Sequence, residues 1–117
     1  VDHDFCAKLK EHGYRILQIG SVKLSHELGK GKNYSILGVK FTALNHSAMR
    51  KYYMVRNWIY YMNEHKDIIN LKAEKKSYRL FFLKTLIFED DKLKKMKQML
   101  KGRRDGIKLI RRIHEIK

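Results

Sequence analysis

Proline is absent from this 117-residue sequence, and cysteine occurs once, as Cys6. A single cysteine excludes an internal disulfide, which fits a reducing compartment without requiring one. Because proline is missing, the boundaries of helices and strands have to be inferred from glycine, hydrophobic periodicity and charge. No internal repeat or low-complexity segment helps to divide the chain.

Long hydrophobic runs are also missing. The longest is Leu80 to Leu83, and Lys84 stops it. Even residues 80–88 fall far below the roughly 20 apolar residues that span a bilayer. The sequence therefore predicts no transmembrane helix, and we expect a cytoplasmic location.

Acidic residues are scarce, with 12 Asp and Glu against 27 Lys and Arg, so the formal net charge is +15. The excess is +3 over residues 1–46 and +12 over residues 47–117. Such a surface attracts nucleic acid, anionic lipid headgroups or diphosphates. Charge alone does not choose among these partners.

The length allows one domain or less. Because the chain opens on Val1 and turns helical at once, we expect it to be a segment of a longer protein. A chain of this size buries only about two-thirds of its unfolded surface. Apolar area that a missing part would cover is therefore expected to be exposed, and homodimers through that surface are one expected outcome.

Helical and β-like patterns alternate along the first part of the chain. Asp2 is a suitable N-cap for a helix that Gly13 ends. Alternating apolar residues between Tyr14 and His26 predict two short strands. Ile36 to Leu44 favours a third strand or an extended arm.

The rest of the sequence predicts helices. Ser47 can cap a long helix that runs to about His65, with an apolar stripe formed by Tyr52, Val55, Ile59 and Met62. Residues 78–88 form a second helix that is apolar nearly all round. A third helix is expected to run to Lys101, where Gly102 interrupts it before a final basic amphipathic segment.

Several short motifs follow one another in a particular order. The first are Val1-Asp2-His3-Asp4-Phe5-Cys6-Ala7-Lys8-Leu9-Lys10, Gly13-Tyr14 and Ser25-His26-Glu27-Leu28-Gly29. The later ones are Asn45-His46-Ser47, Arg50-Lys51-Tyr52-Tyr53-Met54-Val55-Arg56-Asn57 and Gly102-Arg103-Arg104-Asp105-Gly106. Together, over nearly the whole chain, they resemble the C-terminal part of bacterial family 2 glycosyltransferases of the GT-A fold, in the rhamnosyltransferase branch. Two positions depart: Val1 stands where that family often has Glu, and Lys8 where it commonly has Arg.

This resemblance implies an α+β fold in two regions. Residues 1–46 would supply a helix and short strands from the C-terminal edge of a GT-A catalytic domain, and residues 47–117 a basic, mainly helical region. The implied reaction is inverting transfer of a sugar from a nucleotide-sugar donor, with dTDP-rhamnose expected, to a polysaccharide or lipid-linked acceptor. The nucleotide-binding strands and the Asp-x-Asp metal motif would lie upstream, so we expect this chain alone to be inactive.

The resemblance also assigns roles to single residues. Asp2 matches the general base that takes the proton from the acceptor hydroxyl, a role compatible with capping a helix. His26 matches a histidine near the diphosphate, where an imidazole would complete the coordination of Mg²⁺ or Mn²⁺; a structural histidine is the alternative. Arg56 and Asn57 are candidates for binding the diphosphate, and both equally suit structural hydrogen bonds. Asp4 is not assigned to a metal.

Two further interpretations concern aromatic residues. Tyr52 and Tyr53 either pack in the core, which their spacing favours, or stack against a sugar. Phe81, Phe82, Leu86 and Phe88 precede a lysine-rich helix. That arrangement suits contact with the inner face of the plasma membrane, with a solvated charged face as the alternative.

Two function classes compete with the enzyme. Aromatic residues interleaved with cations, as in Lys51-Tyr52-Tyr53 and Tyr78-Arg79, also suit a basic nucleic-acid-binding module. No zinc-ligand spacing, RNA-recognition signature or Gly-x-x-Gly clamp is present, so we expect no specific nucleic-acid partner. A helical scaffold on a membrane surface is the third alternative, supported only by the amphipathic stripes.

Overall fold

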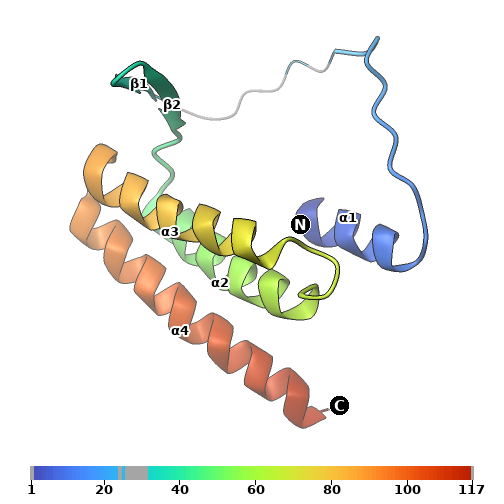
Figure 1. Ribbon diagram of the computed structural model, residues 1–117. Coiled ribbons are helices and arrows are strands. Elements are labelled where there is room, and N and C mark those ends of the chain that lie inside the picture. The colour runs from blue at the N-terminus through green and yellow to red at the C-terminus, as the bar shows by residue number, and fades with distance from the viewer. Residues whose placement is uncertain (1, 24, 26–31, 117) are drawn as a thin grey trace.

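The computed structural model describes residues 2–23, 25 and 32–116, and these form four helices and one β-hairpin. The elements are α1 (Asp2–Glu11), β1 (Lys32–Ile36), β2 (Val39–Ala43), α2 (Ala48–Glu64), α3 (Leu71–Phe88) and α4 (Lys92–Ile116). Figure 1 shows α2, α3 and α4 running side by side in alternating directions, with α1 and the hairpin near opposite ends. The described part of the chain is therefore mainly helical.

Side-chain caps begin two of these helices. Ser47 Oγ accepts a hydrogen bond from the Arg50 amide at 3.3 Å, as the sequence predicts. Asn70 Oδ1 accepts one from the Ala73 amide at 3.1 Å. Each cap pairs an amide group that a first helical turn leaves unsatisfied. At the other end of α1, Gly13 takes a left-handed φ of 77°, which confirms the predicted stop.

Two glycines of α4 lie against the backbone of α2. A Cβ atom at Gly102 would stand 2.4 Å from the carbonyl oxygen of Tyr52, and one at Gly106 would stand 2.9 Å from that of Arg56. The prediction that Gly102 interrupts the helix is wrong, because α4 continues through it to Ile116. Gly102 serves the approach of two helices, which neither α4 nor α2 reveals by its own local sequence.

Aromatic side chains join α3 to α2 and to the hairpin. The Trp58 ring on α2 lies edge-on to Tyr78 and Phe81 of α3, with centroids 5.6 and 5.7 Å apart. Tyr34 on β1 donates a hydrogen bond to the carbonyl oxygen of Phe88 at 3.0 Å. The hairpin is thus fixed to the C-terminal end of α3.

The two strands predicted between Tyr14 and His26 are not formed in the described residues 14–23, so that expectation is wrong there. A strand needs a neighbour for its backbone hydrogen bonds, and none lies beside this segment in the described part of the chain. Its apolar side chains are exposed instead, with Leu17 80% accessible. The strand or extended arm predicted at Ile36 to Leu44 is confirmed over Val39–Ala43, which forms β2. Ile36 instead ends β1, and Leu37 and Gly38 form the turn between the two strands. The strands pair in antiparallel register from Lys32–Ala43 to Ile36–Val39.

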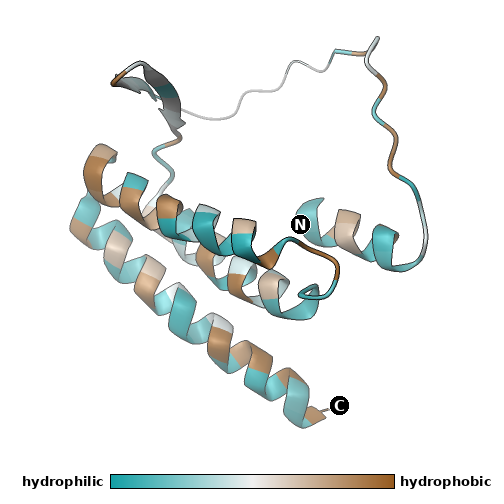
Figure 2. Ribbon diagram, viewed as in Figure 1, coloured by the Kyte–Doolittle hydropathy of each residue, from teal (hydrophilic) through white to brown (hydrophobic). Residues whose placement is uncertain are grey.

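The interior is thin and unusually polar. Among the described residues the fully buried apolar side chains are Ala7, Val55 and Met99. The buried polar and charged ones are His46, Lys51, His65, Thr85, Glu89 and Lys95. Figure 2 shows hydrophilic and hydrophobic residues interspersed along α2, α3 and α4. Buried ionic contacts and hydrogen bonds therefore stabilise the fold together with apolar packing.

We predict that Gly102→Ala lowers the free energy of unfolding by about 1 to 3 kcal/mol, because the new methyl group would overlap the Tyr52 carbonyl. Alanine is intrinsically the better helix former by about 1 kcal/mol, so a loss would identify the helix contact as the cause. Urea denaturation measures the difference. Gly20→Ala is the matched control, because a Cβ there meets no atom within 4 Å. Equal stability of both variants would contradict the close approach.

Candidate functional site

Helix α1 is held against the end of α2 by three side chains, called here the His65 bridge: Asp4, His65 and Glu11. His65, at the C-cap of α2, lies 2.8 Å from Asp4 Oδ1 through Nε2 and 2.6 Å from Glu11 Oε1 through Nδ1. Its side chain is fully buried, while the two carboxylates are about one-third exposed. Lys8 also binds Asp4, at 2.8 Å. The bridge sets the position of α1 on the helical bundle.

The bridge shifts the pKa values of His65 and Asp4. Burial alone would lower the pKa of His65. The hydrogen-bonded carboxylates of Asp4 and Glu11 raise the pKa by more than burial lowers it, so the net pKa lies above the ordinary value. Hydrogen bonds from His65 and Lys8 lower the pKa of Asp4. Both nitrogens of the imidazole face carboxylate oxygens, and only the protonated ring donates from both. The bridge is therefore an imidazolium held between two carboxylates.

Asp2, the candidate base, lies in the first turn of α1. Its side chain is exposed, and it makes no hydrogen bond or ion pair with another described residue. The neighbouring Asp4 has its carboxylate occupied by His65 and Lys8. Two acids that are two positions apart on one helix thus have different surroundings, and only Asp2 offers a carboxylate to an external group.

Arg56 and Asn57 lie together on α2, as expected. Arg56 donates from Nε and Nη2 to Asn57 Oδ1, both at 3.1 Å, and its guanidinium lies 4.9 Å from the centroid of the Tyr53 ring. Among the described residues, no hydrogen bond or ion pair joins Asp2 to Arg56 or Asn57.

Tyr52 belongs to the helix interface, as its spacing favours. Its hydroxyl donates to Asp105 Oδ2 on α4 at 3.0 Å. Tyr53, by contrast, is 43% exposed and carries the Arg56 guanidinium on its face. The two tyrosines therefore divide between the two interpretations: Tyr52 packs, and Tyr53 remains available for stacking.

His26, the candidate metal neighbour, lies outside the described residues. Within the described ranges, no group of three or more His, Cys, Asp and Glu side chains is arranged to hold a metal ion.

A second buried polar cluster joins the start of α2 to the corner between α3 and α4. Lys51 Nζ donates to Glu89 Oε1 at 2.6 Å and to Thr85 Oγ1 at 2.8 Å. Lys95 Nζ donates to Glu89 Oε2 at 3.2 Å and to Asn45 Oδ1. Desolvation by burial lowers the pKa of Lys51, opposed by its hydrogen bond to Glu89. One carboxylate thus compensates two buried ammonium groups.

His46 is buried next to this cluster. Desolvation, followed by the positive charges of Arg50 and Lys51, lowers the pKa of His46. This imidazole is neutral near pH 7, unlike His65, so the two buried histidines have opposite electrostatic roles. Sequence reasoning assigned no role to His46, and it did not reveal His65 because the partners of His65, Asp4 and Glu11, come from a distant part of the chain.

Comparisons of the chain with protein-family models, with curated proteins and with solved structures find no match. Assignment to the glycosyltransferases therefore stays a prediction based on the ordered motifs. The geometry of the site has to be judged from its own residues.

We predict that the stabilisation given by His65 depends on pH. This stabilisation is the difference in unfolding free energy between the native chain and His65→Gln. The raised pKa of His65 makes its contribution complete below about pH 6.5 and lost as the pH rises through the folded-state value. The lowered pKa of Asp4 preserves its contribution until the pH falls below about 3.8. The difference should thus be greatest near about pH 5, at about 1 to 2 kcal/mol.

Urea denaturation from about pH 5 to about pH 9 measures this dependence. His114→Gln, on the exposed last turn of α4, is the matched control and should show no such trend. A difference that grows with pH would contradict a charged His65.

Glu89→Gln should destabilise the fold by about 3 to 5 kcal/mol, because it leaves two buried ammonium groups without a counter-charge. Thermal unfolding followed by circular dichroism measures the loss. Glu115→Gln makes the same chemical change at an exposed position of α4 and should alter stability little. If the two variants unfolded at the same temperature, the buried cluster would make no contribution to stability.

Proposed function

We propose that this chain is the C-terminal part of an inverting glycosyltransferase, in which Asp2 takes the proton from the acceptor hydroxyl. The observation that carries the proposal is the contrast between the two aspartates of α1. Asp4 is bound by His65 and Lys8, whereas the carboxylate of Asp2 is exposed and bound to no other described side chain. A base for an external hydroxyl needs such an accessible oxygen.

The rigidity of α1 supports this role. A general base must stay within hydrogen-bond reach of the hydroxyl that it deprotonates. The His65 bridge ties α1 to α2 through two contacts shorter than 3 Å. Asp2 is two residues from Asp4 on the same helix, so its place relative to the bundle is restricted.

The exposed segment after α1 supports a missing catalytic domain. Residues 14–23 expose large apolar side chains: Tyr14, Ile16, Leu17, Ile19 and Val22. A strand that pairs with the edge of a parallel sheet is buried on its faces. We propose that this segment pairs with the edge of a GT-A sheet in a longer chain, and that the sheet covers these side chains.

Arg56 is the proposed contact for an anionic part of the substrates. The Nε and Nη2 atoms of the Arg56 guanidinium donate hydrogen bonds to Asn57, and the Tyr53 ring packs against the guanidinium. In this proposal the nucleotide-sugar donor, with dTDP-rhamnose the expected one, binds mainly through the upstream domain. A Mg²⁺ or Mn²⁺ ion would neutralise charge on the departing diphosphate, and we assign no described residue to it.

In a longer chain that includes the upstream domain, we expect Asp2→Asn to lower sugar transfer at least about 100-fold. The amide keeps the size of the side chain but removes its basicity. Transfer of radiolabelled sugar from dTDP-rhamnose and related donors to a saccharide acceptor measures the rate.

Two controls separate chemistry from folding. Asp67→Asn changes an exposed acid in the turn after α2 and should leave the rate unchanged. Asp4→Asn should lower thermal stability, since it weakens the His65 bridge. Full activity of Asp2→Asn, in a protein that transfers sugar with the native sequence, would remove Asp2 from the mechanism.

A further inference from the structure

The exposed side of α3 carries cations along its first half and apolar residues along its second half. The face comprises four exposed cations, Lys72, Lys75, Lys76 and Arg79, followed by four exposed apolar residues, Leu80, Leu83, Leu86 and Ile87. At 3.6 residues per turn these eight positions fall within an arc of about 140°. We call this surface the outer face of α3.

The aromatic residues of α3 lie on its other side. Tyr78, Phe81 and Phe82 are at least partly covered, and Tyr78 and Phe81 pack on Trp58. Of the four residues that the sequence suggested for membrane contact, Phe81, Phe82 and Phe88 are thus partly covered, and Leu86 is exposed. The four apolar residues of the outer face are each 43 to 49% accessible, and no other described element covers them.

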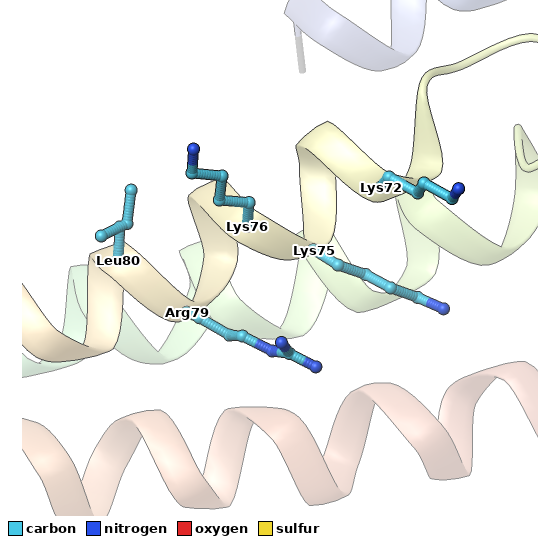
Figure 3. Close-up of a pocket in the computed structure, with 5 residues that line it drawn as sticks. All are labelled: Lys72, Lys75, Lys76, Arg79 and Leu80. Atoms are coloured by element: carbon cyan, nitrogen blue, oxygen red, sulfur yellow. The ribbon is translucent and has the colours of Figure 1, made fainter.

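The charge on the outer face is of one sign. The single acid of α3, Glu74, lies on the inner side, where its carboxylate accepts a hydrogen bond from Trp58 Nε1 at 2.7 Å. Figure 3 shows Lys75 and Arg79 extending to one side of the helix and Lys76 and Leu80 to another, around a hollow that Lys72 also lines. The cations therefore meet no acid on their own helix face.

These features discriminate among occupants. Nucleic acid would pair with the cations but would leave four large apolar side chains in water. A second copy aligned over the whole of this face would bring cations toward cations or toward apolar residues, with no acid on either side to compensate. An anionic bilayer satisfies both halves, because its headgroups attract the cations and its acyl region accepts the apolar side chains.

We infer that the outer face of α3 docks the protein on an anionic lipid surface. The helix lies at the membrane interface, with Leu80, Leu83, Leu86 and Ile87 inserted and the cations of its first half against the headgroups. This is surface attachment, since none of the described helices combines the length and the apolar composition that a membrane span requires. The inference does not depend on the proposed sugar transfer.

Vesicle co-sedimentation tests this inference with the 117-residue chain. Vesicles of phosphatidylcholine alone are compared with vesicles that contain about one third phosphatidylglycerol, at physiological salt. We expect binding to the anionic vesicles and little to the neutral ones. Leu83→Gln combined with Ile87→Gln should weaken that binding about tenfold or more, because it removes insertion without changing charge.

Charge is tested separately. Lys72→Gln combined with Lys76→Gln should weaken binding by roughly fivefold for each cation removed. Lys108→Gln combined with Arg112→Gln removes the same charge from exposed positions of α4 and should have a smaller effect. Leu100→Gln, at another exposed leucine of α4, is the matched control for the apolar change. Circular dichroism verifies that every variant keeps its helices.

A position-specific probe gives a second measurement. In a Cys6→Ser background, an environment-sensitive fluorophore on Leu83→Cys should report an apolar surrounding when anionic vesicles are added. The same fluorophore on Leu100→Cys should not.

Several outcomes would overturn the inference. Binding that is insensitive to Leu83→Gln with Ile87→Gln would show nonspecific attraction of a +15 chain. Equal losses from the α3 and α4 charge variants would show the same. A dimer in sedimentation velocity that the α3 leucine variant dissociates would identify a second copy as the occupant. Absence of binding to anionic vesicles would exclude a lipid surface as the occupant of the outer face of α3.

Discussion

The close approach of α4 to α2 at Gly102 and Gly106 is the constraint on which the rest of the structure depends. Packed helices usually lie about 8 to 10 Å apart, because side chains fill the space between them. At these two glycines that space contains no side chain from α4, so it meets the backbone of α2 directly. Little volume is then left between the helices for an apolar core, which fits the small number of fully buried apolar residues in the described part of the chain. Contacts at the ends of the bundle become correspondingly important.

Each end of the bundle is joined by a buried ionic contact with a different balance of charge. At one end, one imidazolium lies between two partly exposed carboxylates. At the other, Glu89 lies between two buried ammonium groups. Buried ion pairs contribute less net stability than apolar packing of the same volume, but an arrangement with one partner missing is strongly unfavourable. These contacts therefore act mainly by excluding other alignments: α1 has to meet His65, and the α3–α4 corner has to meet Lys51.

The sequence predicts the elements whose signals are local, and it fails where the cause is distant in the chain. Ser47 and the periodic apolar residues after it predict α2 correctly, because cap and stripe lie within one helix. Gly102 is predicted to interrupt a helix because glycine often does so. The sequence does not distinguish such a glycine from one that lets a neighbouring helix approach closely. The segment after α1 alternates like a strand, but no described strand lies beside it to pair with. His65 escaped notice because its partners, Asp4 and Glu11, are 61 and 54 residues away. Lys51 and Lys95 escaped because lysine is almost never expected in a core.

The structure also separates the residues of the resembling motifs by their use. Gly102, Gly106 and Asp105 serve the contact with α2, and Asn45, Lys51 and Ser47 form the corner and the cap at the start of that helix. These residues have physical reasons to be where they are without any substrate. Arg56 and Asn57 likewise have a partner in each other, because Arg56 Nε and Nη2 both donate to Asn57 Oδ1. Among the candidates in the described residues, Asp2 is the one whose carboxylate is exposed and bound to no other described side chain.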